Sequence, residues 1–188
     1  TFTSTPTSFP TNTFTPIPTS AQDIYRVATN GAANSSCGAT WSNPCDLQYA
    51  LSTLANSGDE LWVKQGVYTP GNSRTSTFTL KSGVALYGGF IGTESALNQR
   101  NFDPTTNNTI LSGDIGTVGV IADNVYHVLT AFSVSSSSIL DGFTVTGGNA
   151  NAATGNFGGG LYSENSSPTL TNIIFSNNST NGAGGAMF

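Results

Sequence analysis

The chain has 188 residues, of which 8% are charged, and its formal net charge is −5. Five Lys and Arg residues do not supply the basic surface that nucleic acids and anionic lipids require, so neither is expected as a partner. No run of about 18 apolar residues occurs, and no membrane-spanning segment is predicted. Abundant Ser, Thr, Asn and Gly with so little charge are typical of extracellular β-structure, and the length is sufficient for one domain with its own core.

Residues 1–22 are predicted to be an extended tail or stalk. Residues 1–20 contain eight Thr, four Pro, three Ser and three Phe residues and no charge, which is too little apolar area to form a core. This composition is typical of polyproline-like stalks that carry O-linked glycans. The expected glycosylation positions are Thr3, Thr5, Thr7 and Thr15. The apolar positions spaced to anchor an extended strand on a neighbouring surface are Phe2, Phe9, Phe14 and Ile17.

Residues 23–188 are predicted to form one domain, which opens with a strand at Ile24–Thr29, where apolar and polar residues alternate. Two cysteines follow, Cys37 and Cys45, with Gly and Pro residues between them to turn the chain. Their spacing favours a local disulfide, and hence an oxidising compartment and a secreted, extracellular or cell-surface protein. Two unpaired buried thiols are the alternative.

No metal ion or cofactor is predicted, because the sequence has no CxxC motif and its only histidine, His127, lies far from both cysteines. His127 stands in an alternating strand, where a structural role is favoured over a catalytic one.

A short helix is predicted over residues 46–55, where Asp46 is placed as the N-cap and Asn56-Ser-Gly58 ends the helix. It completes the N-terminal unit of residues 23–58. We expect this helix to lie across the end of a stack of repeats, which would otherwise expose apolar core and strand edges. An ordinary surface helix is the alternative. The apolar face consists of Leu47, Ala50, Leu51 and Leu54.

The remaining segments alternate in the manner of short strands, each bounded by Gly, Asn, Pro or Asp. Residues 91–108 are the least strand-like interval and are predicted to be a loop that leaves the main body. No helical stretch is expected after residue 56. The predicted strands are 60–64, 66–69, 77–80, 84–87, 109–112, 126–130 and 138–140.

The C-terminal part repeats itself. Residues 140–150 match residues 170–180 at an offset of 30, and residues 158–162 match residues 184–188 at an offset of 26. Repeats of 20 to 50 residues with short alternating strands and Gly or Asn corners predict an all-β fold, a right-handed single-stranded parallel β-helix. A chance match in a Gly- and Asn-rich chain is the alternative. The predicted core consists of Val63, Val67, Leu80, Leu86, Ile110, Val128, Leu140, Phe143, Val145, Ile173 and Phe175.

A series of motifs runs through residues 24–188: Asp46-Leu-Gln-Tyr-Ala-Leu51, Ser57-Gly-Asp-Glu-Leu-Trp-Val63, Gly66-Val-Tyr68, Leu86-Tyr-Gly-Gly-Phe90, Leu111-Ser-Gly-Asp-Ile115, Tyr126-His-Val128 and Leu140-Asp-Gly-Phe-Thr-Val-Thr-Gly-Gly-Asn149. As a series they resemble the right-handed parallel β-helix proteins of bacterial surfaces, which are secreted, pectin-lyase-like solenoids that share features with polymorphic outer-membrane repeat proteins. Such proteins usually continue through more coils and a closing cap. This sequence stops in mid-repeat, and because it begins at Thr1 without a signal-like segment we interpret it as processed or as a piece of something larger.

No catalytic residues are predicted. Enzymes of this fold that cleave acidic polysaccharides need a basic residue or paired carboxylates, and no Lys or Arg follows Arg100. Asp114 and Asp141 each stand beside Gly, which favours turn residues that accept backbone hydrogen bonds over a catalytic pair. Trp41 and Trp62 are expected in the core rather than as a sugar platform. The Asn runs 107–108 and 177–178 are expected to stack their amides from coil to coil.

These patterns favour a non-catalytic extracellular structural protein, a β-helix module of a cell-surface adhesin or of a filament. A polysaccharide lyase or hydrolase and a glycan-binding module are the alternatives. Self-association is expected head to tail, with the last coil at Met187 and Phe188 covered by the first coil or the N-terminal tail of another copy. Glycans and other cell-surface components are further candidate partners.

Overall fold

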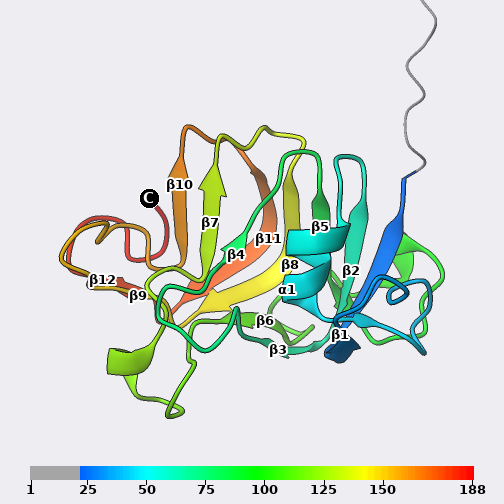
Figure 1. Ribbon diagram of the computed structural model, residues 1–188, viewed down its shortest axis with the longest axis horizontal. Coiled ribbons are helices and arrows are strands. Elements are labelled where there is room, and N and C mark those ends of the chain that lie inside the picture. Colours follow the sequence, from blue (N-terminus) through cyan, green and yellow to red (C-terminus); the bar gives the residue numbers. More distant parts are fainter. Residues whose placement is uncertain (1–21) are drawn as a thin grey trace, which may run out of the picture.

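Figure 1 shows the computed structural model of the protein, which describes residues 22–188. Within these residues the protein is mostly β, and every pairing between its strands is parallel. The strands are β1 (Ile24–Ala32), β2 (Glu60–Lys64), β3 (Gly66–Tyr68), β4 (Phe78–Thr79), β5 (Ala85–Phe90), β6 (Thr109–Ser112), β7 (Leu129–Phe132), β8 (Ile139–Thr146), β9 (Asn149–Ala150), β10 (Leu161–Glu164), β11 (Thr169–Ser176) and β12 (Ser179–Thr180).

The helical segments are short. The predicted helix consists of α1 (Leu47–Tyr49) and a π-helical turn, η1 (Ala50–Leu54). The prediction that nothing helical follows residue 56 needs a small correction, because single 3₁₀ turns occur at η2 (Leu97–Gln99) and η3 (Ile121–Asp123). The predicted tail positions lie outside the described residues: Phe2, Thr3, Thr5, Thr7, Phe9, Phe14, Thr15 and Ile17.

The sheets are curled, and the chain passes through three rows of parallel strands in turn; one such passage is called a circuit below. The first row contains β1, β2, β5 and the starts of β8 and β11. The second row contains β3, β6 and the ends of β8 and β11, and the third row contains β4, β7 and β10. In Figure 1 the circuits follow one another from the blue β1 at one end toward the orange β10 and β11 at the other.

The sequence repeats coincide with the register of the strands. β11 pairs with β8 so that Ile173 lies opposite Phe143, which is the predicted offset of 30. The bridge between Leu161 and Met187 has the predicted offset of 26. Equivalent side chains of the two repeats therefore lie beside each other, which is why both copies carry the same pattern.

The corners between rows use the left-handed backbone region, as their Gly and Asn content predicts. Gly142 has a φ of 83° and its repeat partner Asn172 a φ of 50°, while Gly147 and Asn177 have φ values of 77° and 51°. Glycine and asparagine enter this region at lower cost than other residues. The same turn is thus made at the same place in successive circuits.

The amides of the Asn runs do not stack on one another as predicted. Asn107 Nδ2 donates to the carbonyl of Gly142 at 3.0 Å, and Asn178 Nδ2 donates to the carbonyl of Val145 at 2.8 Å. Both carbonyls belong to β8, and buried carbonyls need donors. These side chains therefore satisfy the backbone of a neighbouring circuit.

The core lies between the rows. Of the predicted core residues, Val63, Leu80, Leu86, Val128, Leu140, Phe143 and Val145 are buried, and Ile173 and Phe175 pack against them while partly exposed. The prediction is wrong for Val67, which is 57% exposed, and for Ile110, which is only half-buried beside it. Tyr68 takes the inward position opposite Leu111, and because side chains alternate along a strand, Val67 must point outward.

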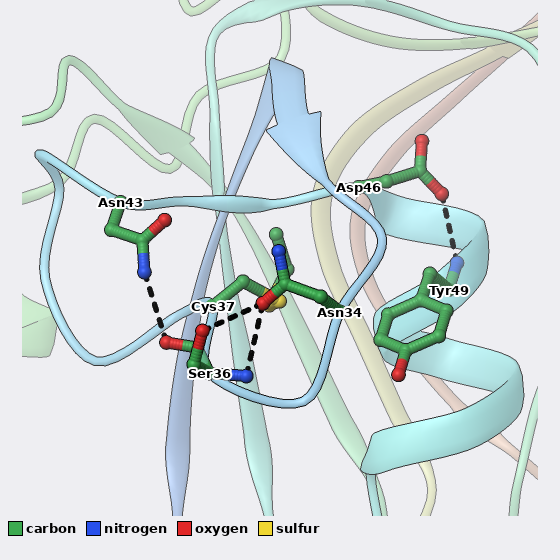
Figure 2. The surroundings of a disulfide bond; sticks show 7 residues. Asn34, Ser36, Cys37, Asn43, Asp46 and Tyr49 are labelled. Atoms are coloured by element: carbon green, nitrogen blue, oxygen red, sulfur yellow. Dashed lines mark hydrogen bonds between the residues drawn. A yellow bond between two sulfur atoms is a disulfide. The ribbon is translucent and has the colours of Figure 1, made fainter.

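The disulfide loop and the helix both close the β1 end of the molecule (Figure 2). Cys37 and Cys45 form the predicted disulfide, and the loop returns along the free edge of β1, where the N–H of Arg26 donates to the carbonyl of Gly38 at 2.9 Å. Asp46 caps the helix by accepting the N–H of Tyr49 at 2.8 Å. The helix buries Leu47, Ala50 and Leu51 in the core cluster.

We expect replacement of both Cys37 and Cys45 by Ala to lower the free energy of unfolding by about 2 kcal/mol, because the unfolded chain regains the freedom of a short closed loop. Guanidinium denaturation followed by circular dichroism measures the change. Reduced wild-type protein is the matched control and should unfold at the midpoint of the double variant. Equal midpoints for the double variant and the oxidised wild type would contradict the expectation.

Candidate assembly site

The apolar rows of the core continue to the edge formed by β11. Leu140, Phe143 and Val145 of β8 are each 0% exposed. Their partners one circuit further, Leu170, Ile173 and Phe175 of β11, are only partly buried. Within residues 22–188 β11 pairs with β8 alone, so its other edge offers backbone N–H and C=O groups that no strand covers.

Met187 and Phe188, two of the predicted assembly residues, belong to the same circuit as β11. The N–H of Ser163 in β10 donates to the carbonyl of Phe188 at 2.8 Å, and Met187 lies opposite Leu161. Met187 is 49% exposed and Phe188 is 50% exposed. This segment therefore extends the third row by one further strand-like layer.

An open pocket of about 360 Å³ separates the two strand-like parts of this circuit. Its lining combines apolar residues, among them Leu161, Leu170 and Met187, with serines of β10 and of the corner before β11. The lining residues are Leu161, Ser163, Ser166, Ser167, Pro168, Leu170, Met187 and Phe188. The assembly surface is defined as these residues together with Ile173 and Phe175.

Aromatic rings stack along the third row beside this surface. Phe188 lies over Phe157 with ring centroids 4.6 Å apart, and it is nearly parallel to Tyr162 at 6.2 Å. Desolvation and the nearby Glu164 carboxylate raise the pKa of the Tyr162 phenol. Because these rings cover one another's faces, they do not form the open row of ring faces on which sugars stack.

His127 has a structural position, as predicted. Its Nδ1 atom lies 3.0 Å from the carbonyl oxygen of Gly158, and its ring stacks on Tyr162 with centroids 5.3 Å apart. A nitrogen held by a corner carbonyl in the next circuit fixes the ring orientation. His127 therefore fastens two neighbouring circuits together.

The two carboxylates weighed as a catalytic pair lie near opposite ends of β8. Asp141 is at its start, whereas Asp114 follows Ser112, which pairs with Thr146 at its end. Asp114 behaves as predicted, since its Oδ2 accepts the N–H of Gly119 at 2.8 Å. The prediction for Asp141 is wrong: its partners are side chains, Arg100 at 2.5 Å and Asn172 at 2.7 Å.

The ion pair between Arg100 and Asp141 was not predicted. Arg100 lies in the loop of residues 91–108, and its side chain returns to the sheet, where it also donates to the carbonyl of Gly88 at 2.9 Å and lies over the ring of Tyr87. Its side chain is 7% exposed and that of Asp141 is 14% exposed. Arg100, the basic residue nearest to the repeats, therefore binds the loop of residues 91–108 to the sheet.

The same loop is anchored at its other end by Glu94. The carboxylate of Glu94 accepts the N–H groups of Ile91 at 2.7 Å and of Gly92 and Thr93 at 2.9 Å. Burial raises the pKa of Glu94, but these backbone N–H groups together lower it below its usual value. Glu94 is therefore held ionised as part of the loop structure.

Trp41 and Trp62 lie together in packed positions, as favoured by the sequence. Trp62 is 3% exposed and its ring stacks on Phe90 at 4.8 Å, while Arg26 lies 5.5 Å from the centroid of the Trp62 ring. Trp41 is half-buried and its Nε1 donates to the carbonyl of Glu94 at 2.8 Å. No ring face of Trp62 is free to receive a sugar.

Within residues 22–188, the protein is a curled stack of parallel β strands in which the disulfide loop pairs with the β1 edge and no described strand pairs with the outer edge of β11. No protein-family model, curated protein or solved structure matches the chain. Among the helices of residues 22–188, none is long and apolar enough to cross a membrane.

Proposed function

We propose that this chain is a non-catalytic structural module of an extracellular or cell-surface assembly. Residues 23–188 form a right-handed parallel β-helix domain, and the assembly grows along its axis. The intramolecular disulfide and the scarcity of charge support an extracellular setting. The parallel register of 30 between β8 and β11 supports the solenoid, because such stacking has no built-in limit.

The observation that carries this proposal is that the β1 edge is covered, whereas no strand of residues 22–188 covers the outer edge of β11. At the β1 end, the disulfide loop pairs with the strand edge and the helix buries the apolar side chains. At the β11 end, Leu170, Ile173 and Phe175 remain partly exposed beside an unpaired edge. Because the β1 edge is already covered, stacking of one first circuit on another molecule's last circuit is not favoured.

The occupant that we assign to the β11 edge is the segment of residues 1–20 from a second copy. All four of its prolines, Pro6, Pro10, Pro16 and Pro18, are at even positions. Successive N–H groups of an extended strand point to opposite edges, so the missing donors all fall on one edge and every odd-numbered residue keeps its N–H. A strand of this kind can pair through the edge that keeps its N–H groups. Its other edge lacks the donors that a further strand would need.

The prolines and the threonines of residues 1–20 occupy opposite faces of an extended strand. Phe2 and Phe14 share the even-numbered face with the prolines, whereas Phe9 and Ile17 lie with the threonines on the odd-numbered face, so two of the four predicted apolar anchors face β11. The even face matches the inward apolar side chains of β11, and the odd face matches outward residues such as Thr169 and Thr171. A tail that docks on a different surface of the next copy makes a contact that does not close, so the assembly propagates as a filament.

We expect full-length protein to form concentration-dependent polymers, and protein lacking residues 1–20 to be monomeric, by sedimentation velocity and electron microscopy. The matched control keeps length and composition but exchanges Thr5 with Pro6 and Thr15 with Pro16, which interrupts both strand edges. Its association constant should fall at least about tenfold. Unchanged assembly of this variant or of the deletion would exclude the tail as connector, and strictly monomeric full-length protein would exclude assembly.

A further inference from the structure

A second pocket lies at the corner that follows the second row. It has a volume of about 330 Å³ and lies between the loop of residues 113–125 and the corners at Gly147 and Asn177 of the two following circuits. It is distinct from the assembly surface, with which it shares no residue. Its lining residues are Ser112, Asp114, Gly119, Ile121, Asn124, Thr146, Gly147 and Asn177.

Buried oxygen atoms without hydrogen-bond partners gather in this loop. Within residues 22–188 five buried side-chain polar atoms lack a partner, and three of them are Asp114 Oδ1, Asp123 Oδ1 and Asn124 Oδ1. All three are acceptors, and Asp114 and Asn124 line the pocket. Asn124 is 5% exposed. A buried acceptor left unpaired costs about 1–3 kcal/mol, and a bound cation or ordered water removes that cost.

The backbone holds these side chains in place through their other polar atoms. Asp114 Oδ2 accepts the N–H of Gly119 at 2.8 Å, and Asp123 Oδ2 accepts the N–H of Thr117 at 2.8 Å. Asn124 Nδ2 donates to the carbonyl of Gly147 at 2.7 Å. Each side chain is therefore oriented by one atom while one oxygen remains unpaired, and of the three side chains those of Asp114 and Asn124 line the pocket as candidate ligands.

No cationic side chain of the described residues neutralises this loop. The single ion pair within residues 22–188 joins Arg100 to Asp141. Arg74 is the basic residue that approaches the loop, and its guanidinium is engaged with backbone oxygens of Asn124 and Asn149 and with the Asn151 side chain. The carboxylates of Asp114 and Asp123 therefore have no cationic partner there.

We infer that this pocket binds a calcium ion. Its candidate ligands are oxygens of carboxylate, amide and hydroxyl type, from Asp114, Asn124, Ser112 and Thr146, which Ca²⁺ accepts in irregular geometry. The lining contains neither Cys nor His, which disfavours zinc and copper. Within residues 22–188 no three His, Cys, Asp or Glu side chains are grouped for a metal ion, so the site carries few charges and its affinity is low. Extracellular sites of this kind have dissociation constants of about 10⁻⁴–10⁻³ M.

The bound ion ties the loop to two circuits at once. Asp114 follows β6, Thr146 ends β8 and Asn177 follows β11, so successive circuits meet at the pocket. The inference does not depend on assembly, because every residue involved belongs to one chain. Calcium is therefore expected to stabilise monomeric protein lacking residues 1–20 as much as full-length protein.

The test is calorimetric titration of chelator-treated full-length protein with CaCl₂, combined with thermal unfolding at 0 and 10 mM CaCl₂ and constant ionic strength. We expect saturable binding and a raised melting temperature in the wild type. Asp114→Asn should weaken binding at least about tenfold, because the carboxylate is the strongest ligand in the lining. Asp103→Asn is the matched control, since Asp103 lies in another loop with its carboxylate bonded to Thr105, and it should bind as the wild type does.

Two results would overturn the inference. The first is the absence of calcium-dependent heat and of any shift in melting temperature in the wild type. The second is an equal loss of binding in the Asp114 and Asp103 variants, which would indicate general electrostatic attraction. If Asp114→Asn does not fold by circular dichroism, Thr146→Val takes its place because Thr146 is also a candidate ligand, and unchanged calcium binding by that variant would count against the site.

Discussion

Replacement of Phe143 by Ala is expected to lower the free energy of unfolding by about 3–5 kcal/mol, one of the two largest effects anticipated for a single change. Phe143 is 0% exposed, in the middle of β8, and its partner Ile173 lies one circuit further. Removal of the ring leaves a cavity in the core cluster, and the paired strands around it cannot close the gap without breaking their register. Guanidinium denaturation of the variant measures the loss.

Phe132→Ala is the matched control, because Phe132 is 50% exposed. Among the aromatic rings of residues 22–188, its ring contacts that of Tyr162, in an edge-on arrangement. We expect this variant to lose less than about 1 kcal/mol. A comparable loss in both variants would show that Phe143 does not lie at the centre of the core.

Replacement of Arg100 by Met is expected to cost about 3–5 kcal/mol, because it leaves the carboxylate of Asp141 buried without its cationic partner. The guanidinium contacts Asp141 at 2.5 Å and the carbonyl of Gly88 at 2.9 Å, so both acceptors lose a donor. Asn172, which donates to Asp141 at 2.7 Å, supplies only part of the compensation. Thermal and guanidinium unfolding report the change in stability.

The control for Arg100 is the double variant Arg100→Met, Asp141→Leu, which removes both charges. Its stability should recover most of the loss, because an apolar pair of similar volume carries no uncompensated charge. A double variant as unstable as the single one would show that the packing of the loop, rather than the ion pair, is responsible.

Local patterns predicted the elements that depend on neighbouring residues. The alternation in residues 60–64 and 109–112 predicted β2 and β6 with the correct bounds, and Asp46 was identified as a helix cap. The repeat offsets predicted the register of β8 and β11, because in-register parallel stacking brings equivalent residues together. The disulfide followed from the spacing of two cysteines.

Features that depend on three-dimensional neighbours could not be predicted in this way. The outward direction of Val67 is set by Tyr68 and its partner in the next circuit. The ion pair joins residues 41 positions apart, through a loop whose path the sequence does not specify. The proposed calcium pocket is formed by corners of successive circuits. The sequence around Asp114 predicted only a turn residue, because it does not show which other corners lie nearby. The pairing of the disulfide loop with the β1 edge likewise has no local pattern.

The closed β1 end also gives the chain a direction in which its structure can be laid down. Within a row, each strand pairs only with strands of the neighbouring circuits. The strand edge exposed by one circuit is therefore the template for the next. The disulfide loop and the helix follow β1 and precede β2 in the sequence. In a chain that emerges N-terminus first, the outer edge of β1 is therefore covered before β2 is added to the other edge, and from then on the chain has a single growing face.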